Sequence, residues 1–121
     1  MNLLICGSRT WSDYDLLRDV IKGVSENVEI DALVAGGAVG ADQMAAAAAK
    51  ELKIIFREYR ADWDKHGKAA GPIRNQEMLD KEHPSLLIAF WDGKSKGTID
   101  MISRANKAGC RIRIVRERST P

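Results

Sequence analysis

The residues best suited to chemistry gather in four short stretches rich in glycine and polar side chains. Three of them read GSRTWSD, GGAVGAD and DGKSKGT, and the fourth spans residues 63–72. The last of the three places two lysines and a hydroxyl beside an expected helix start, where free N–H groups and the helix dipole attract anions. Arg9 and Arg74 add guanidinium forks that suit phosphate or carboxylate. This pattern predicts a phosphate site.

Neither glycine stretch matches a standard nucleotide motif. GKSKGT lacks the G-x-x-x-x-G-K-[ST] order of a P-loop, and GGAVGAD is not G-x-G-x-x-G and follows the second apolar run rather than the first. Three glycines in five positions still indicate that the backbone approaches another group closely. The alternative, that they serve only tight turns and helix caps, stays open. Asp42 is expected to cap the helix that follows.

Aromatic and acidic side chains near the same stretches are further candidates. Trp11, Trp63 and Trp91 could stack on a base, although a core position is the simpler interpretation for Trp91. The aspartates that could supply a carboxylate are Asp13, Asp42, Asp62, Asp64, Asp92 and Asp100.

Cysteines and histidines show no pattern of metal ligation. Cys6 and Cys110 lie in apolar surroundings without ligand spacing, and His66 and His83 pair neither with them nor with each other. We therefore expect no metal, no cofactor, and two reduced, buried thiols in a cytoplasmic protein.

The elements that position these residues follow from hydrophobic patterning. Apolar runs that end at glycines or polar clusters predict buried strands, and apolar residues at 3.6 spacing predict helices. Pro72 suits the first turn of a helix, and Ser12 or Asp13 can cap the first one. Residues 60–71 show no clean period and are expected to form one long connection. The predicted strands are 2–6, 31–35, 53–59, 85–91 and 110–117, and the predicted helices are 13–24, 41–52, 72–81 and 98–108.

Alternating strands and helices predict an α/β fold with a five-stranded parallel sheet covered on both faces. Right-handed crossovers favour a Rossmann-like sheet of order 3-2-1-4-5. Ligands bind such sheets at the carboxyl ends of the strands, which is where all four chemical stretches fall. We expect one domain over residues 1–121, with a frayed end at 119–121.

Bulk properties exclude several classes of protein. The chain has 121 residues and a formal net charge of +2, too small by itself to indicate nucleic-acid binding. Its apolar runs are shorter than a membrane span needs, and residues 2–6 lack the features of a secretory signal. No membrane association is expected.

Four motifs, in order along the chain, resemble the YspA-like branch of the SLOG superfamily. They are GSR, GGAVGAD, W-x-x-H-G-x-x-A-G-P-x-R-N-x-x-M over residues 63–78, and G-x-x-x-G-T over residues 93–98. Such proteins are Rossmann-like and common in bacteria and phages. The superfamily includes LOG phosphoribohydrolases, DprA-like DNA-binding proteins and proposed sensors of nucleotide or ADP-ribose-derived signals. The resemblance implies a nucleotide-like ligand, approached by Gly36, Gly37 and Gly40, and a homo-oligomer.

The sequence matches the LOG motifs only in part. Arg74 and Met78 match the LOG R-K-x-x-M element, and Gly97 with Thr98 matches the glycine–threonine of its P-G-G-x-G-T-x-x-E element. The glutamate of that element is Met101 here, and Asp100 stands one position earlier, about 100° around the helix. A carboxylate stabilises the cation-like sugar when an N-glycosidic bond breaks, so this departure weakens the prediction of hydrolysis.

Three hypotheses follow. The first is binding of a nucleotide or ADP-ribose-like ligand, as a sensor or sequestering protein. The second is an N-glycosidase of nucleoside 5′-monophosphates in which Arg74 and Asp100 are catalytic. The third, less favoured, is DNA binding through Lys94, Lys96, Arg111, Arg113, Arg116 and Arg118. The residues expected to contact the ligand are Gly7, Ser8, Arg9, Gly36, Gly37, Gly40, Asp42, Trp63, His66, Gly67, Gly71, Arg74, Asn75, Gly93, Lys96, Gly97 and Thr98.

Overall fold

The computed structural model describes residues 1–117, in which strands and helices alternate as predicted. Arg118 and the expected frayed end at 119–121 lie outside the described residues. The strands are β1 (Asn2–Gly7), β2 (Ala32–Gly36), β3 (Phe56–Tyr59), β4 (Leu86–Phe90) and β5 (Arg111–Val115). The helices are α1 (Tyr14–Asn27), α2 (Ala41–Leu52), α3 (Trp63–His66), the 3₁₀ turn η1 (Gly67–Ala69), α4 (Ala70–Glu82) and α5 (Lys96–Lys107).

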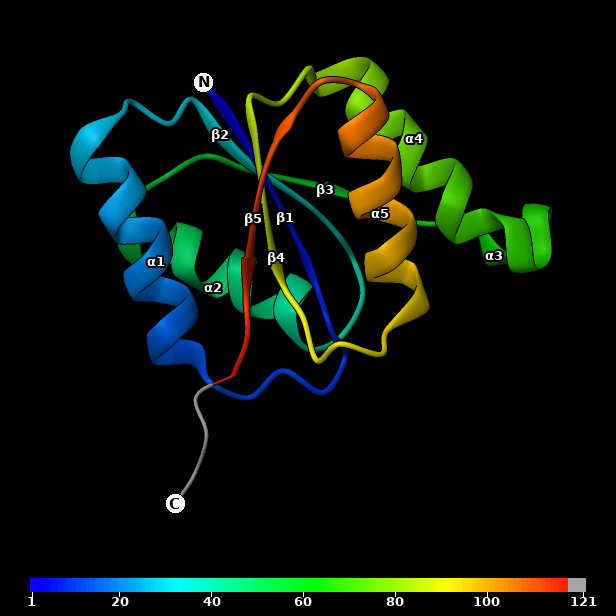
Figure 1. Ribbon diagram of the computed structural model, residues 1–121, viewed down its shortest axis with the longest axis horizontal. Coiled ribbons are helices and arrows are strands. Elements are labelled where there is room, and N and C mark those ends of the chain that lie inside the picture. The colour runs from blue at the N-terminus through cyan, green and yellow to red at the C-terminus, as the bar shows by residue number, and fades with distance from the viewer. Residues whose placement is uncertain (118–121) are drawn as a thin grey trace.

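The five strands form one parallel sheet in the order β3-β2-β1-β4-β5, which confirms the predicted Rossmann-like topology. Figure 1 shows α1 and α2 on one face of the sheet and α4 and α5 on the other. The direction of winding reverses between β1 and β4, so their carboxyl ends open the crevice where ligands bind in such sheets.

Each helix layer buries one apolar stripe against the sheet. On one face, Leu17 and Ile21 of α1 are fully buried, and four alanines of α2 let that helix lie close to the strands. On the other face, Met78 of α4 and Met101 of α5 pack on the alternate side chains of the strands. β4 is buried on both faces, as its continuous apolar run predicts.

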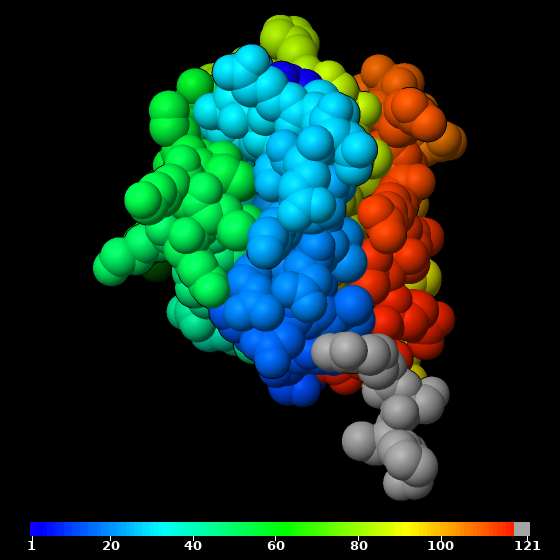
Figure 2. All heavy atoms as spheres, turned by 90° about the vertical axis from the view of Figure 1, so that its left-hand side faces the viewer, coloured from blue at the N-terminus to red at the C-terminus, as the bar shows by residue number. Residues whose placement is uncertain are grey.

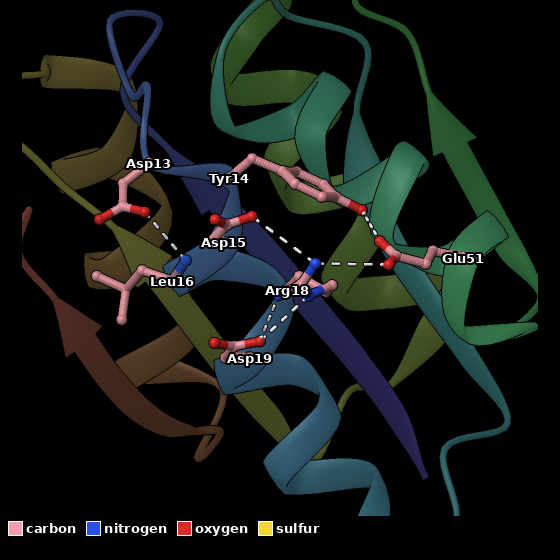
Figure 3. Close-up of polar contacts among 7 residues, drawn as sticks. All are labelled: Asp13, Tyr14, Asp15, Leu16, Arg18, Asp19 and Glu51. Atoms are coloured by element: carbon pink, nitrogen blue, oxygen red, sulfur yellow. Dashed lines mark hydrogen bonds and ion pairs between the residues drawn. The ribbon is translucent and has the colours of Figure 1, made fainter.

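A polar network joins α1 to α2 across their outer surface (Figure 3). Arg18 pairs with Asp19 at 3.0 Å and reaches Glu51 at 3.5 Å, while the Tyr14 hydroxyl donates to the other Glu51 oxygen at 2.6 Å. Figure 2 shows α1 on this side of the molecule, between the green chain around α2 and β3 and the red strand β5. The network fixes the two helices relative to each other.

Residues 60–71 differ from the prediction, because they hold α3 and η1 rather than an irregular connection. Asp62 caps α3 by accepting a hydrogen bond from the Lys65 backbone N–H at 3.1 Å. A helix of four residues is too short to show an apolar period, so patterning could not find it. η1 runs directly into α4, which therefore begins at Ala70, two residues before Pro72.

Three smaller expectations were also wrong. Lys53 ends α2 in the left-handed conformation, with φ of 58°, so β3 starts only at Phe56. α5 begins at Lys96 rather than at Thr98. Cys6 is buried as expected, but Cys110 is only half-buried.

β5 is an edge strand, and its alternating sequence predicts that Ile112 and Ile114 face one way and Arg111 and Arg113 the other. The two arginines are exposed and Ile112 packs on the core, but Ile114 is exposed as well. Within the part of the chain that the structure describes, no helix is both long and apolar enough to cross a membrane.

Candidate functional site

A cavity of about 440 Å³ opens at the carboxyl ends of β1 and β2, between the N-terminal ends of α2, α4 and α5. Its floor is apolar, formed by Ile5, Cys6 and Met78. Burial raises the pKa of the Cys6 thiol far above its usual value, so this thiol stays protonated. The walls carry the polar and charged residues that the loops supply. The cavity therefore lies where the fold predicts a ligand.

Arg74 is the central cation of the cavity. Its Nε donates to the Asn75 side-chain oxygen at 3.1 Å and its Nη1 donates to the Tyr59 carbonyl at 3.2 Å. No carboxylate of residues 1–117 forms an ion pair with it. Backbone and amide contacts thus hold the guanidinium in position without neutralising its charge, and an anionic ligand can do so.

The end of β3 that carries the Tyr59 carbonyl is anchored by a second network. The Tyr59 hydroxyl donates to Glu82, which also pairs with Arg57 at 2.6 Å and accepts a hydrogen bond from the Asn2 amide at 3.3 Å. The bond to Glu82 raises the pKa of Tyr59 to about 12. Because Tyr59 orients Arg74, this network supports the cavity from outside.

Further cations border the cavity at Arg9, Lys68 and Lys96. None of them forms an ion pair or a side-chain hydrogen bond with another residue of the described chain. Asp42 and Asp100 also line the cavity, but neither forms an ion pair with Arg9, Lys68 or Lys96.

The helices differ in how their N-terminal ends are capped. Asp13 caps α1 and Asp62 caps α3, whereas no side chain caps α2, α4 or α5, whose first turns border the cavity. The first N–H groups of α5 are thus free to bind an anion, and the helix dipole favours one there.

Hydrogen bonds within the loop fix the segment before α5. The Asp92 carboxylate accepts from the backbone N–H groups of Lys94 at 2.7 Å and Ser95 at 2.8 Å, and these bonds lower its pKa. The Ser8 hydroxyl accepts from the Asp92 N–H at 2.8 Å, which ties the loop to the end of β1. Ser8 and Asp92 therefore shape the loop and do not line the cavity.

Asp42 lies in the cavity wall, and the prediction that it caps its helix was wrong. Gly40 is the N-cap residue, and the Asp42 carboxylate instead accepts from the backbone N–H of Ala38 at 3.2 Å. Burial raises the pKa of Asp42 to about 6, although the Ala38 N–H and the Arg74 charge oppose this rise. The turn after β2 brings Ala38 back over the helix, which spacing alone does not reveal.

The three glycines of GGAVGAD have distinct roles. A Cβ on Gly36 would lie 2.3 Å from Arg74 Nη1 and 2.9 Å from Asp42 Oδ2, so this glycine makes room for the two charged groups. A Cβ on Gly40 would meet the Ser8 carbonyl oxygen at 2.4 Å, and Gly40 has a φ of 81°. Gly37 faces Arg60 and Glu58, outside the cavity. Glycine is therefore needed at positions 36 and 40 because other groups of the protein itself lie close to the backbone there.

Asp100, the predicted catalytic carboxylate, lines the cavity but is already engaged. Its Oδ2 accepts from Asn75 Nδ2 at 3.0 Å and from Arg104 Nε at 2.9 Å. Met101, which stands where LOG enzymes have glutamate, is fully buried in the core between the sheet, α4 and α5. The Asp100 carboxylate serves to join α4 to α5.

The three tryptophans lie in different environments. Trp11 is a core residue, with its ring edge-on to Phe90 at a centroid distance of 5.3 Å. Trp91 is half-buried and carries the Arg116 guanidinium 5.9 Å from its ring centroid. Trp63 alone of the three borders the cavity, with 51% of its surface exposed. Only this tryptophan can stack on a ligand there.

Most of the predicted site residues meet at this cavity. Six do not line it: Ser8, Gly37 and Gly40 shape its surrounding loops, His66 and Gly67 lie in the α3–η1 segment, and Gly93 lies against Arg116. The predicted residues that line it are Gly7, Arg9, Gly36, Asp42, Trp63, Gly71, Arg74, Asn75, Lys96, Gly97, Thr98 and Asp100.

Sequence reasoning missed Lys68, Ser95 and the apolar floor. Ser95 directly precedes α5, so its position was predictable once the start of that helix was known. Lys68 is carried by η1, which the pattern did not reveal. Among residues 1–117, no three His, Cys, Asp or Glu side chains are grouped so that they could hold a metal ion.

Comparison with known proteins agrees with this geometry. The model of the YspA, cpYpsA-related SLOG family matches residues 1–66, which is more than half of the chain. The chain belongs to this family. The match runs from β1 to α3 and includes the first two cavity loops, while Arg74 and α5 lie beyond it.

This SLOG protein is also similar to the "Gene 61 protein" of Mycobacterium phage D29. The two are 36% identical over 116 residues, which cover 88% of this chain and 90% of the relative. The phage protein's name states no activity. Membership of the SLOG family supports a nucleotide-related ligand or a glycosidase-like role, and it confirms the resemblance that the loop motifs predicted.

Proposed function

We propose that this SLOG protein binds a nucleotide or nucleotide-derived ligand in the cavity between α2, α4 and α5, with the ligand's phosphate held by Arg74 and the first turn of α5. The observation that carries the proposal is the unpaired guanidinium of Arg74 beside an uncapped helix N-terminus. An arginine held by backbone contacts, or a helix without a side-chain cap, could each serve a purely structural role. Together they form a cationic site of the size and chemistry of a phosphate group.

Asn75 joins the two parts of this phosphate site. Its side-chain oxygen accepts from Arg74 Nε, and its Nδ2 lies 3.5 Å from the Gly97 carbonyl in the first turn of α5. Asn75 itself is buried. We therefore place one phosphate between Arg74 and the first turn of α5, which line the same cavity, with Lys96 adding charge from the rim.

Binding without cleavage agrees better with the contacts of Asp100, the carboxylate predicted to be catalytic, than hydrolysis does. The predicted N-glycosidase would use Asp100 to stabilise the sugar cation, and this carboxylate is held by an ion pair with Arg104 and a hydrogen bond from Asn75. Met101 is buried in the core, away from the cavity. We therefore propose a role in sensing or sequestering the ligand.

The test is thermal unfolding of the protein with AMP, GMP, ADP-ribose, NAD and ribose 5-phosphate, followed by titration calorimetry of any ligand that raises Tm. We expect Arg74→Ala to lose at least tenfold in affinity, because a charge-assisted bidentate contact disappears. Arg113→Ala is the matched control, since Arg113 is an exposed arginine on β5, lies outside the cavity and has no ion-pair partner among residues 1–117.

The same samples are analysed by mass spectrometry for free base. Intact ligand with a raised Tm supports binding. Free base that Arg74→Ala and Asp100→Asn abolish would replace the proposal with hydrolysis. A panel without any shift in Tm would refute it.

A further inference from the structure

Asp42 is an acid in a cavity whose other free side chains are hydrogen-bond donors. Only 8% of its surface is exposed, yet it forms no ion pair with any residue of the described chain. One carboxylate oxygen, Oδ2, accepts from the Ala38 N–H, and the other has no protein partner within residues 1–117. No described side-chain atom is both shut off from solvent and unpartnered, so this second oxygen is open to the cavity that Asp42 lines.

Water can reach this oxygen, so a ligand that displaces water from the cavity must donate a hydrogen bond to it or leave it unpaired. Arg9, Arg74 and Lys96 are donors, and none of them pairs with Asp42. The other cavity carboxylate, Asp100, differs because an ion pair with Arg104 neutralises its charge, although both of its donors bind the same oxygen, Oδ2. The site is thus complementary to a ligand with acceptor oxygens at one end and uncharged donors close beside them.

The donor end of the site, at Arg74, and the acceptor end, at Asp42, lie close together. Arg74 and Asp42 approach the same point above Gly36, the place a Cβ would occupy, to within 2.3 Å and 2.9 Å. In a nucleoside 5′-monophosphate the sugar lies between the phosphate and the base. A group next to the phosphate-binding arginine is therefore positioned for the sugar hydroxyls, whereas the base edge lies farther away.

We propose that Asp42 accepts hydrogen bonds from the sugar hydroxyls of the ligand, so that the site selects ribose phosphates over 2-deoxyribose phosphates. This inference rests on the proposed phosphate binding at Arg74. It assigns Asp42 a role in specificity: the carboxylate that is unfavourable for a bare phosphate is matched by the hydroxyls of a ribose phosphate.

The experiment compares two ligand pairs on two proteins by titration calorimetry. The ligands are ribose 5-phosphate with 2-deoxyribose 5-phosphate, and AMP with 2′-deoxy-AMP. The proteins are the wild type and Asp42→Asn, which keeps an oxygen to accept from Ala38 but loses the negative charge. Asp64→Asn is the matched control: it removes one charge from an exposed residue that lies outside the cavity and has no partner among residues 1–117.

In the wild type we expect the ribose ligand of each pair to bind about tenfold to a hundredfold more tightly, because hydrogen bonds to a charged group are the strong ones. Asp42→Asn should reduce this ratio to within about threefold of unity, while Asp64→Asn leaves it unchanged. If AMP binds more tightly than 2′-deoxy-AMP, ribose 5-phosphate must also bind more tightly than 2-deoxyribose 5-phosphate.

Three results would overturn the inference and leave phosphate binding intact. The first is equal binding of ribose and deoxyribose ligands to the wild type. The second is an unchanged ratio in Asp42→Asn, and the third is tighter binding of both ligands to that variant, which would place the phosphate beside Asp42. Failure of all four ligands to bind the wild type, with no effect of Arg74→Ala on any nucleotide, would instead refute the proposed function itself.

Discussion

Replacing Asp42 by asparagine should stabilise the unliganded protein at neutral and alkaline pH. Burial raises the pKa of this carboxyl from 3.8 to about 6. Between these two values the folded protein holds a proton that the unfolded chain has released, so the free energy of unfolding falls as the pH rises through this window. Above the window the ionised carboxylate is a full cost to the folded state.

The size of this cost follows from the rise in pKa. A rise of about 2.2, at 1.36 kcal/mol for each pKa unit, corresponds to about 3 kcal/mol at pH 8. Arg74 and Arg9 lower the pKa of Asp42, Glu58 raises it, and all three contributions are contained in that value. Asparagine cannot ionise, but its side-chain oxygen can still accept from the Ala38 N–H. We therefore expect Asp42→Asn to exceed the wild type by about 3 kcal/mol at pH 8, with the difference disappearing towards pH 4.

Urea unfolding of both proteins at several pH values, followed by tryptophan fluorescence, measures this difference directly. Trp11 is buried in the core and reports on loss of the tertiary structure. Asp64→Asn controls for the change in net charge. A difference that is the same at pH 4 and pH 8, or an Asp42→Asn protein that is less stable at pH 8, would refute the reasoning.

Three further substitutions test other parts of the structure. Gly36→Ala adds a Cβ only 2.3 Å from Arg74 Nη1, at the far end of a flexible side chain, so it should displace the guanidinium and lower ligand affinity at least tenfold while changing stability little, as calorimetry and urea unfolding would show. Glu82→Gln weakens the 2.6 Å pair with Arg57 and should lower the free energy of unfolding by about 1–3 kcal/mol; an unchanged urea midpoint would contradict the role assigned to this network. Asp13→Ala removes the cap of α1 and should cost about 1 kcal/mol, whereas Asp13→Asn should retain most of the stability in the same assay.

The fold was predictable because its signals are local. Apolar runs that stop at glycines marked the buried strands, and the alanines of α2 indicated a helix lying close to the sheet. Topology then followed from the handedness of the crossovers. The errors fall where an element is shorter than the period that would reveal it, as in α3, or where one helix continues another, as at Pro72.

The location of the candidate site could be predicted from the sequence, but several of its contacts could not. The loops at the carboxyl ends of the strands were found from glycine and polar clusters, and Arg74 and Asp42 do face one cavity. The contact between Asp100 and Asn75 could not be predicted, because Asn75 lies on another helix, 25 residues away, whereas the pairing of Asp100 with Arg104 four residues later on the same helix is visible from spacing. Likewise, a glycine that makes room for an arginine of a distant helix has the same local pattern as one that makes room for a ligand.

The cavity is built from segments that lie far apart in the sequence, so it can form only late in folding. Gly36 ends β2, Tyr59 ends β3, Arg74 belongs to α4 and Gly97 lies in the first turn of α5, so the proposed phosphate site spans elements joined only in the finished structure. A chain that has paired β1 with β2 and β3 still lacks the helix that carries the guanidinium and the strand that leads to the last helix. Pairing of distant parallel strands is a slow step. Competence to bind an anion should therefore appear late in refolding, after most of the secondary structure has formed, and a bound phosphate would mark the molecules that have completed their topology.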